Sequence, residues 1–351
     1  FMKLTFTTTS PSLILAAVKE LATEAWQQEI VGFLEQWCDD RSFVELKTSG
    51  STGEPKLIQM PKQTMLRSAQ MTNAFFGLDE SSVALLCLPA SYIAGKMMVV
   101  RAIAGMYTLV AVKPSSNPFE EVASLKIDFT AITPYQLTHS YKTISSLSIT
   151  NIIIGGSQVT PAMEGLIRDW PIAIYETFGM TETASHIAVR KLNGADKSEY
   201  FRALPGVGLS VDQRGCLEIV APHLYTGTLV TNDLVELHDP DLFRWLGRYD
   251  RVVNSGGVKL FPEQIERKLH DLIELPFFIS ALPHPALGEQ LVLVVEAGEL
   301  SEEIQKELIA SMKNRLGRYE LPGRIICIPE FVYSTGNKVL RNETLKKRIG
   351  H

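Results

Sequence analysis

The sequence has no apolar stretch long enough to cross a membrane and no excess of basic residues. None of its hydrophobic runs reaches the roughly 18 residues that a spanning helix requires. The 351 residues carry a net charge of −5, whereas nucleic-acid-binding proteins usually present a basic face. The apolar residues at 13–18 are too few for a signal peptide. We therefore expect a cytoplasmic protein with no membrane span and no nucleic-acid partner.

Cysteine is also scarce, and its four positions form no pattern. Cys38, Cys87, Cys216 and Cys327 are widely separated, and no CxxC pair or cluster with histidine occurs. This spacing argues against a disulfide framework and against a structural zinc site. Internal repeats and low-complexity tracts are missing too. With 45% hydrophobic and 21% charged residues, the chain is typical of a globular protein with room for one large and one small domain.

The most informative segment is residues 48–56, where four hydroxyl side chains, two glycines and a lysine lie together. Such a loop can turn tightly and bring backbone N–H groups, hydroxyls and a cation close to a polyphosphate. It is not a Walker A loop, because Gly50 and Gly53 have the wrong spacing and no hydroxyl residue follows Lys56. A P-loop phosphotransferase is therefore disfavoured. A surface turn without a ligand is the alternative.

This run resembles the phosphate-binding signature of the adenylate-forming enzymes, which include acyl-CoA synthetases, luciferases and peptide-synthetase adenylation domains. Three further segments follow in the order of that family. The resemblance implies ATP and Mg²⁺ as cofactors. It also assigns the phosphates to a set of loop residues, namely Thr48, Ser49, Gly50, Ser51, Thr52, Gly53 and Lys56.

The second segment, residues 175–183, resembles the family's adenine- and magnesium-binding motif. The resemblance implies that Phe178, before Gly179, stacks on adenine, since stacking needs only a π face. It assigns Thr181 to phosphate and Glu182 to magnesium, for which a carboxylate oxygen is a suitable ligand. A strand end with a solvated glutamate is the alternative. The turn after a buried strand, formed by Gly155, Gly156 and Ser157, resembles the backbone that passes the adenine.

The third and fourth segments supply charged groups. By resemblance, Asp233 accepts hydrogen bonds from the ribose hydroxyls, Arg248 supports the same sugar, and Asp250 is the hinge. Residues 336–341 resemble the family's C-terminal lysine motif, with Lys338 as the catalytic lysine. Asn337 departs from the usual pattern by separating glycine from lysine. Ordinary surface charges are the alternative for each of these residues.

The pattern of apolar residues predicts an α/β protein. Residues 16–37 and 62–76 have helical spacing, and short β-rich runs at 83–88, 108–112 and 151–154 alternate with helical stretches. This alternation favours a mainly parallel, helix-covered sheet, followed by a β-rich part at residues 215–248. Residues 261–272, 291–296 and 301–315 then read as helix, strand and helix. We expect an adenylation domain at residues 1–249 and a small mobile α+β lid at residues 250–351.

The family chemistry comprises two half-reactions at one site. A carboxylic acid reacts with ATP to form an acyl-adenylate and pyrophosphate, and the thiol of CoA then displaces AMP. Lys338, Glu182, Thr181 and Lys56 would carry the first step through charge neutralisation. Members of the family usually have a much longer segment before the phosphate loop, so we expect a shortened N-terminal region.

The acid is indicated by two segments that resemble o-succinylbenzoate–CoA ligases of menaquinone biosynthesis, residues 88–95 and 179–187. The unreactive carboxylate of that acid needs a cation or several donors. Lys96 and Arg101 are the candidate cations, with ordinary exposed bases as the alternative. Tyr92, Ser185 and His186 are further candidates for the acid pocket, although a structural role for His186 is also open.

Other functions remain open from the residues alone. Another aryl or short-acyl CoA ligase, or an adenylation enzyme that loads a carrier protein, would carry the same motifs. A non-catalytic relative that binds nucleotide or acyl ligand is the alternative of another class. A homo-oligomer is compatible with the sequence.

Overall fold

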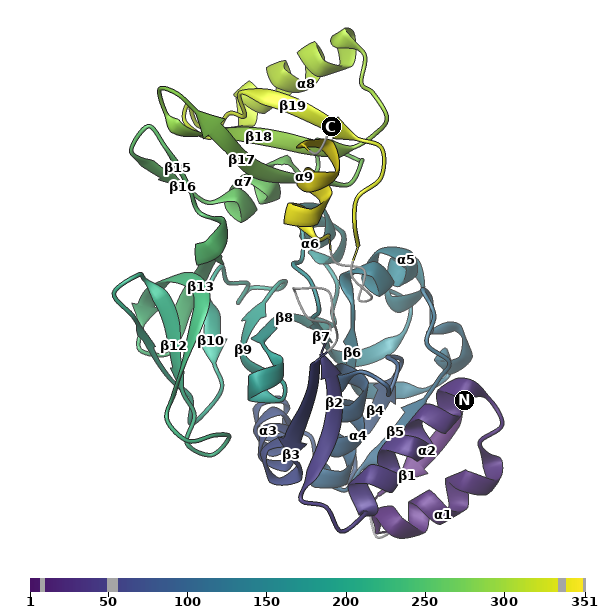
Figure 1. Cartoon of the computed structure of the whole chain (residues 1–351). Coiled ribbons are helices and arrows are strands. Elements are labelled where there is room, and N and C mark those ends of the chain that lie inside the picture. Colours follow the sequence, from purple (N-terminus) through teal and green to yellow (C-terminus); the bar gives the residue numbers. More distant parts are fainter. Residues whose placement is uncertain (7–9, 49–55, 334–338, 350–351) are drawn as a thin grey trace.

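The computed structural model describes residues 1–6, 10–48, 56–333 and 339–349, and Figure 1 shows their arrangement. The first elements are β1 (Met2–Thr5), α1 (Pro11–Leu21), α2 (Ala25–Cys38), β2 (Phe43–Thr48), β3 (Lys56–Pro61) and α3 (Lys62–Phe76). The alternating part follows, with β4 (Val83–Leu86), α4 (Ile93–Gly105), β5 (Thr108–Ala111), η1 (Glu120–Val122), β6 (Lys126–Ile132), α5 (Pro134–Ile144), β7 (Ser148–Ile154), α6 (Pro161–Ile167), β8 (Ala173–Gly179), η2 (Thr181–Thr183) and β9 (His186–Lys191).

The second half of the chain is richer in strands. It continues with β10 (Phe201–Ala203), β11 (Gly208–Val211), β12 (Cys216–Val220), β13 (Thr228–Asp239) and β14 (Leu242–Arg248). A short 3-10 helix, η3 (Tyr249–Arg251), leads to the C-terminal part, which comprises β15 (Val253–Ser255), β16 (Val258–Leu260), α7 (Pro262–Leu269), β17 (Phe277–His284), β18 (Gly288–Glu296), α8 (Glu302–Arg315), β19 (Arg324–Ile328) and α9 (Arg341–Ile349).

The large sheet has twelve strands in the order β1-β5-β4-β6-β7-β8-β9-β10-β14-β13-β12-β11. Strands β5, β4, β6, β7 and β8 run parallel, and the remaining pairings are antiparallel. Parallel neighbours need crossover connections, which explains why helices separate these strands in the sequence. The expected α/β class, with a helix-covered parallel sheet and a β-rich part, is confirmed.

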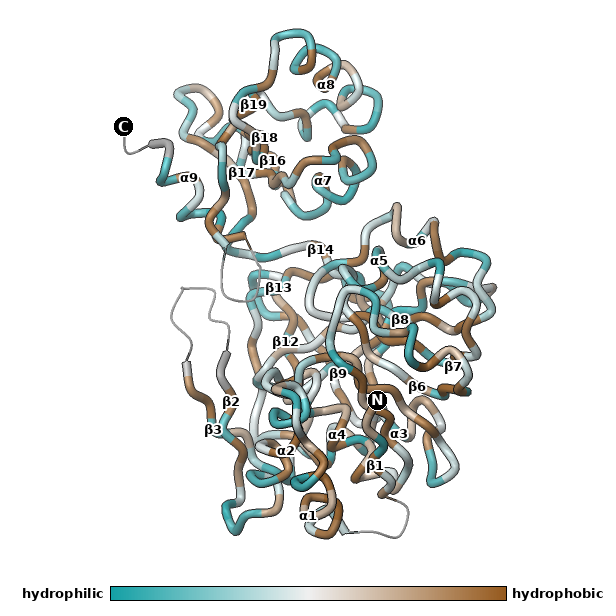
Figure 2. Tube along the Cα trace, turned by 90° about the vertical axis from the view of Figure 1, so that its right-hand side faces the viewer, coloured by the Kyte–Doolittle hydropathy of each residue, from teal (hydrophilic) through white to brown (hydrophobic). Residues whose placement is uncertain are grey.

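Alternate residues of the parallel strands point to opposite faces of the sheet, and both faces are buried. In β4, Ala84 and Leu86 belong to a core that includes residues of α3 and α4, whereas Leu85 belongs to a second core with residues of α5 and α6. Figure 2 shows the hydrophobic segments along these central strands. The near-continuous apolar runs of the sequence therefore correspond to strands with helices on both faces.

One of the two long helices expected from the sequence forms as a single helix, and the other is divided in two. The helix expected at residues 62–76 is α3, with the same bounds. The single helix expected at residues 16–37 is wrong, because the chain forms α1 and α2 with a break between them. The side chain of Gln27 accepts hydrogen bonds from the backbone N–H groups of Thr23 and Glu24, which starts a new helix at this point.

The C-terminal part has its own five-stranded sheet, in which β18 pairs with β15, β17 and β19. Residues Leu291, Leu293 and Val295 of β18 face α7 and α8, whereas Val292 and Val294 pack on the side of Phe331. This part stands at one end of the molecule in Figures 1 and 2. The helix, strand and helix expected at 261–272, 291–296 and 301–315 are α7, β18 and α8.

Within the residues that the structure describes, no helix combines the length and apolarity needed to span a membrane. Along the chain, β14 is the last strand of the large sheet and β15 is the first strand of the five-stranded sheet; η3 lies between them. A division into a separately moving lid at residue 250 stays a prediction.

Candidate active site

The predicted phosphate loop connects the two strands of a hairpin. Strands β2 and β3 pair antiparallel, with Thr48 opposite Lys56 at the end of the ladder. Residues 49–53 lie outside the described residues, as do the side chains of Thr48 and Lys56. Lys338 lies outside them too, between Tyr333 and Val339, which form an isolated antiparallel bridge. The roles assigned to these residues stay predictions.

The turn after β7 runs beside β8, as the sequence indicated. The backbone N–H of Gly155 donates to the carbonyl of Ile132 at 3.1 Å, and Thr177 Oγ1 donates to the carbonyl of Ile154 at 3.0 Å. A Cβ atom on Gly155 would lie 2.7 Å from Thr177 Oγ1, so only glycine fits without a shift. Gly156 follows with φ of +93°, and Ser157 is exposed.

Phe178 lies near the end of β8 and is half-buried. Its ring meets Phe201 and Phe243 nearly edge to face, at centroid distances of 5.9 and 5.1 Å. Edge-to-face packing is a favoured arrangement of aromatic pairs, so these two contacts hold the Phe178 ring in place. Stacking of Phe178 on adenine stays a prediction.

Residues 179–186 form a tight turn that brings the end of β8 against the start of β9. A Cβ atom on Gly179 would lie 2.5 Å from both the carbonyl oxygen of Ser185 and Cα of His186, so the close approach requires glycine. Thr183 Oγ1 lies 2.9 Å from the carbonyl of Met180 and 2.6 Å from that of Ser185. The sequence motif contained Thr183, but its role in closing the turn appears only in the structure.

Strain is concentrated just before Ser185. Ala184 has φ of +60°, a left-handed value that costs energy for any residue with a Cβ atom.

Residues Thr181 and Glu182 lie in η2, at the start of this turn. Glu182 is exposed and makes no hydrogen bond or ion pair within the described part of the chain. Its carboxylate is therefore available to a hard cation such as Mg²⁺.

Arg101 is the largest fully buried side chain of the described residues, with 2% of its surface exposed. One terminal nitrogen donates to Ser185 Oγ at 2.6 Å and the other to Met98 Sδ at 3.4 Å, whereas Nε has no partner. No carboxylate pairs with it among the residues described here. Burial lowers the pKa of Arg101 to about 10, which still leaves the group charged at neutral pH.

His186 lies beside the same pair and is buried. Its Nδ1 atom is 3.3 Å from Ser185 Oγ, and its Nε2 atom is 3.4 Å from Thr72 Oγ1. Burial, and then the positive charge of Arg101, hold the pKa of His186 well below the usual 6.5, so the ring is neutral. The structure thus brings together three of the five residues considered for the acid pocket: Arg101, Ser185 and His186.

The other two candidates lie at the opposite end of α4. Tyr92 precedes the helix and is 51% exposed. Lys96 is buried rather than exposed, so the alternative of an ordinary surface base is wrong for it, as it is for Arg101. Its Nζ atom donates to the carbonyl of Ala90 at 2.8 Å and lies 5.1 Å from the ring centre of Phe33. Lys96 is thus held by a backbone carbonyl and a ring. Arg101 also lies near a ring, with Cζ 5.9 Å from the centre of Phe129, but it differs in that its Nε–H group has no hydrogen-bond partner.

Asp233 and Arg248 are brought together by the pairing of β13 with β14, where they are direct neighbours. Arg248 Nη1 lies 3.7 Å from Asp233 Oδ2, and Trp245 Nε1 donates to Asp233 Oδ1 at 3.0 Å. Burial raises the pKa of Asp233. The hydrogen bond from Trp245 and the charge of Arg248 lower it, but by less than burial raises it. Trp245 was missed from the sequence, because its contact depends on the antiparallel register rather than on a motif.

Replacement of Trp245 by phenylalanine should weaken ATP binding without changing acid binding. The variant keeps the aromatic ring but leaves Asp233 Oδ1 without its donor, so that carboxylate loses its fixed orientation toward the predicted ribose site. We expect KM for ATP to rise on the order of three- to tenfold, the effect of one hydrogen bond. Steady-state kinetics with Trp170→Phe as the control checks this, since Trp170 packs in a different core. Equal KM values for ATP in both variants would contradict the role of Trp245.

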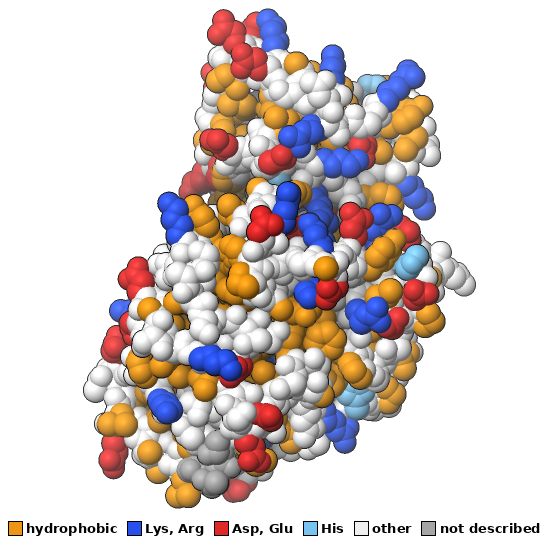
Figure 3. All heavy atoms as spheres, turned by 180° about the vertical axis from the view of Figure 1, so that it is seen from behind, with side chains coloured by type: hydrophobic (Ala, Val, Ile, Leu, Met, Phe, Trp, Pro, Cys, Tyr) orange, Lys and Arg blue, Asp and Glu red, His pale blue; other side chains and the backbone are white. Residues whose placement is uncertain are grey.

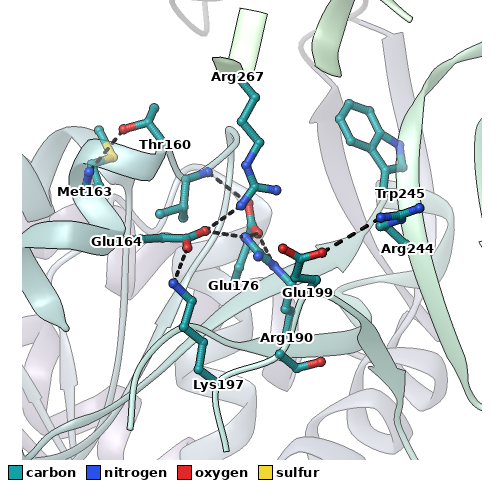
Figure 4. Close-up of polar contacts among 12 residues, drawn as sticks. Thr160, Met163, Glu164, Glu176, Arg190, Lys197, Glu199, Arg244, Trp245 and Arg267 are labelled. Carbon is teal, nitrogen blue, oxygen red and sulfur yellow. Dashed lines mark hydrogen bonds and ion pairs between the residues drawn. The ribbon is translucent and has the colours of Figure 1, made fainter. Parts of the chain in front are cut away.

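A buried ionic network connects the C-terminal part to the large sheet (Figure 4). Arg190 donates to Glu176 at 2.6 Å and to Glu164 at 3.0 Å, and Arg267 of α7 donates to Glu164 at 2.8 Å. Burial would raise the pKa of Glu164, but Lys197, Arg190 and Arg267 together hold it below the ordinary value. Figure 3 shows basic side chains gathered at this junction on one face of the molecule.

The network also touches the predicted nucleotide site. The backbone N–H of Val159 donates to Glu176 Oε1 at 2.9 Å, which ties the segment after Gly156 to strand β8. At the other side of the junction, Asp250 lies exposed in η3 and accepts from Arg248 Nε at 3.3 Å. Its role as the hinge residue stays a prediction.

Comparison with known proteins places this geometry in a family. The family model described as AMP-binding enzyme matches residues 19–222, more than half of the chain. The acyl-CoA synthetase (AMP-forming)/AMP-acid ligase II-like protein of Dyadobacter fermentans has a crystal structure with a TM-score of 0.64. It is 34% identical to this chain, and the match covers 99% of each chain.

Two further relatives are more distant. The 2-succinylbenzoate–CoA ligase of Lactococcus lactis is 25% identical over 324 residues, which cover 87% of this chain and 71% of that protein. The o-succinylbenzoate CoA synthetase of Bacillus subtilis, solved with its acyl-adenylate intermediate, has a TM-score of 0.73 at 19% identity; the match covers 96% of this chain and 81% of that one. The expected resemblance is thereby confirmed, and this chain belongs to the AMP-binding enzyme family, whose members are adenylate-forming enzymes.

Proposed function

We propose that this enzyme converts o-succinylbenzoate to its CoA thioester through an acyl-adenylate, a step of menaquinone biosynthesis. The observation that carries the choice of acid is Arg101, a fully buried guanidinium without a carboxylate partner in the described part of the chain. The similarity of this chain to the 2-succinylbenzoate–CoA ligase of Lactococcus lactis supports the same choice of acid.

The energetic argument concerns the unpaired charge. Transfer of a charged group into a protein interior costs several kcal/mol unless it is paired and hydrogen-bonded. Arg101 has only a hydroxyl and a thioether as acceptors, and its Nε–H group has none. A substrate that brings a carboxylate would supply the missing pair, and charge-assisted hydrogen bonds of this kind are strong. An acid with a single carboxylate cannot do so, because that carboxylate must react with ATP.

Adenylation requires charge neutralisation more than covalent participation of the protein. An oxygen of the substrate carboxylate forms a bond to the α-phosphorus of ATP, and the bond from that phosphorus to pyrophosphate breaks. Lys338, Thr181 and the loop at residues 48–56, with Lys56, would stabilise the negative charge that moves onto pyrophosphate. Glu182, which is exposed and without a described partner, fits the requirement for a magnesium ligand, and the ion would supply further positive charge.

The nucleotide would be held by the residues that the sequence indicated. Asp233 and Arg248, adjacent on β13 and β14, would bind the ribose, and Phe178 would stack on adenine beside the turn at residues 155–157. In support, the Bacillus subtilis synthetase has been solved with ATP and a magnesium ion.

The second half-reaction transfers the acyl group to CoA. The thiol sulfur forms a bond to the acyl carbon, the bond from that carbon to the phosphate oxygen of AMP breaks, and AMP leaves. The thiol proton passes to solvent. We propose that residues 250–351 act as a lid that rotates about Asp250 between the two steps. The ion pair of Arg267 with Glu164 would hold the arrangement seen here, and its loss would release α7. Cytoplasmic location and a homo-oligomer also remain proposals.

Replacement of Arg101 by methionine tests the proposed acid. We expect kcat/KM for o-succinylbenzoate to fall by about two to three orders of magnitude, the effect of removing one partner of a buried charge pair. The free enzyme should keep or gain thermal stability, because a buried charge without a partner has been removed. Mass spectrometry of the products from Mg-ATP, CoA and o-succinylbenzoate, beside benzoate and short fatty acids, provides the measurement.

Two results would count against the proposal. A wild-type enzyme that forms a thioester only from benzoate or a fatty acid has a different substrate, and acyl-AMP without thioester indicates a carrier protein as acceptor. The exposed residue Arg202, paired with Asp241 at 2.7 Å, provides the control as Arg202→Met, for which activity should not change.

A further inference from the structure

A chain of hydrogen bonds leads from α3 through His186 to Arg101. Thr72 Oγ1 lies 3.1 Å from the carbonyl of Ser68 and 3.4 Å from His186 Nε2. His186 Nδ1 lies 3.3 Å from Ser185 Oγ, which lies 2.6 Å from Arg101 Nη2. Two helices and the turn before β9 are thus linked by side chains that are buried or half-buried.

The direction of these hydrogen bonds follows from the chemistry of the two ends. Arg101 can only donate, so Ser185 Oγ accepts from it and has its own proton free for His186 Nδ1. Thr72 gives its proton to the carbonyl of Ser68, so its oxygen accepts from His186 Nε2–H. With these directions, the Ser185 hydroxyl and both ring nitrogens of His186 are satisfied only if His186 is the neutral Nε2–H tautomer.

The charge state of His186 agrees with this direction. The ring is buried with Arg101 close by, and both effects hold its pKa well below 6.5. A protonated ring would carry a hydrogen on Nδ1, and Ser185 would then face two donors instead of one. A neutral ring is therefore the state in which Ser185 can accept from Arg101 and donate to His186.

The backbone around this pair is held independently. Ser185 follows the strained Ala184, its carbonyl oxygen accepts from Thr183 Oγ1 at 2.6 Å, and Gly179 allows the close approach of residues 185 and 186. The turn therefore sets the positions of Ser185 and His186, and the hydrogen bonds set the orientation of their polar atoms. Such support around a binding group is typical of preorganised sites.

We propose that His186 is a positioning residue for acid recognition. His186 Nδ1 accepts a hydrogen bond from Ser185 Oγ, which turns the lone pairs of that oxygen toward Arg101. The hydrogen bond from Arg101 to Ser185 then fixes the direction in which the guanidinium offers its remaining N–H groups to the unreactive carboxylate of the acid. Thr72 selects the tautomer of His186 that can do this. The inference rests on the proposed function of Arg101 as the carboxylate-binding group.

Two substitutions at one position separate this role from simple packing. His186→Asn keeps an acceptor near the Nδ1 position, whereas His186→Gln keeps a donor near Nε2 and removes the Nδ1 acceptor. We expect KM for o-succinylbenzoate to rise about tenfold in His186→Gln and to change less than about threefold in His186→Asn, the scale of one hydrogen bond. KM for ATP and kcat at saturating acid should stay within about twofold in both variants, since the nucleotide groups are untouched.

A second pair tests the other end of the chain. Thr72→Val removes the acceptor for Nε2–H at nearly constant volume and should raise KM for the acid in the same direction, whereas Thr72→Ser should restore it. Thermal unfolding of each variant shows whether the fold is kept. Equal KM values for the acid in His186→Gln and His186→Asn, in folded proteins, would overturn the role of His186.

The tautomer can be measured without turnover. Nitrogen-15 NMR of the histidine rings, with the His186 signals identified by their loss in His186→Asn, should show a neutral Nε2–H ring at pH 7. A charged ring or an Nδ1–H tautomer would overturn the inference even if the enzyme is active. Conversely, an Nε2–H ring in an enzyme that forms no o-succinylbenzoyl-CoA would overturn the proposed acid while leaving the hydrogen-bond chain established.

Discussion

Replacement of Lys338 by alanine is expected to abolish formation of the acyl-adenylate and to spare formation of the thioester from a supplied acyl-adenylate. A cation close to the transferring phosphoryl group stabilises the charge that develops there, and loss of one such donor typically costs about 10²- to 10³-fold in rate. The second half-reaction transfers an acyl group and does not need this cation. Pyrophosphate release reports the first step, and thioester formation from synthetic acyl-adenylate reports the second.

The structure anchors both ends of the segment that contains Lys338. Tyr333 and Val339 form a bridge, and Arg341 at the start of α9 makes a bidentate ion pair with Glu266 at 2.7 and 2.8 Å. Lys346→Ala is a suitable control, because this lysine of α9 is exposed. If Lys338→Ala releases pyrophosphate as fast as the wild type, the assignment of the catalytic lysine is wrong.

Replacement of Arg190 by methionine is expected to produce a large loss of stability. Arg190 is 2% exposed and neutralises two buried carboxylates, so its removal leaves Glu176 with only the backbone N–H of Val159 as a described partner. Removing one partner of a buried ion pair costs about 3–5 kcal/mol in the free energy of unfolding. Chemical denaturation followed by tryptophan fluorescence measures this change.

The matched control is again Arg202→Met, whose ion pair with Asp241 is exposed and should contribute less than about 1 kcal/mol. Adding Glu176→Gln to Arg190→Met should recover part of the loss, because it removes the uncompensated charge. A loss for Arg190→Met no larger than that of Arg202→Met would contradict this account. Because Glu176 holds the segment at Val159, the single variant should also raise KM for ATP.

Much of the fold was predictable because hydrophobic periodicity is a local property. The helix at residues 62–76 and the strands after residue 215 followed directly from it. The break between α1 and α2 was missed, although Thr23, Glu24 and Gln27 form a helix-start pattern there. The continuous apolar spacing on either side concealed it.

The candidate site was predictable in its motifs but not in its contacts. Asp233 and Arg248 could be named from their segments, whereas Trp245 becomes a partner of Asp233 only through strand register. Lys96 and Arg101 looked equivalent in the sequence. Their difference comes from α4, which carries Lys96 to the carbonyl of Ala90 and Arg101 to Ser185.

The order of its motifs was enough to assign this chain to the adenylate-forming enzymes, because each motif is a short segment whose residue types already carry its chemistry. Tertiary structure alone decided that Arg101 is buried beside Ser185, that His186 lies between Ser185 and Thr72, and that Arg267 joins α7 to Glu164. The physical reason is distance along the chain: Arg101 and Ser185 are 84 residues apart, and Thr72 and His186 are 114 apart. Burial and hydrogen-bond direction at such pairs depend on how helices and strands pack, which no local pattern specifies.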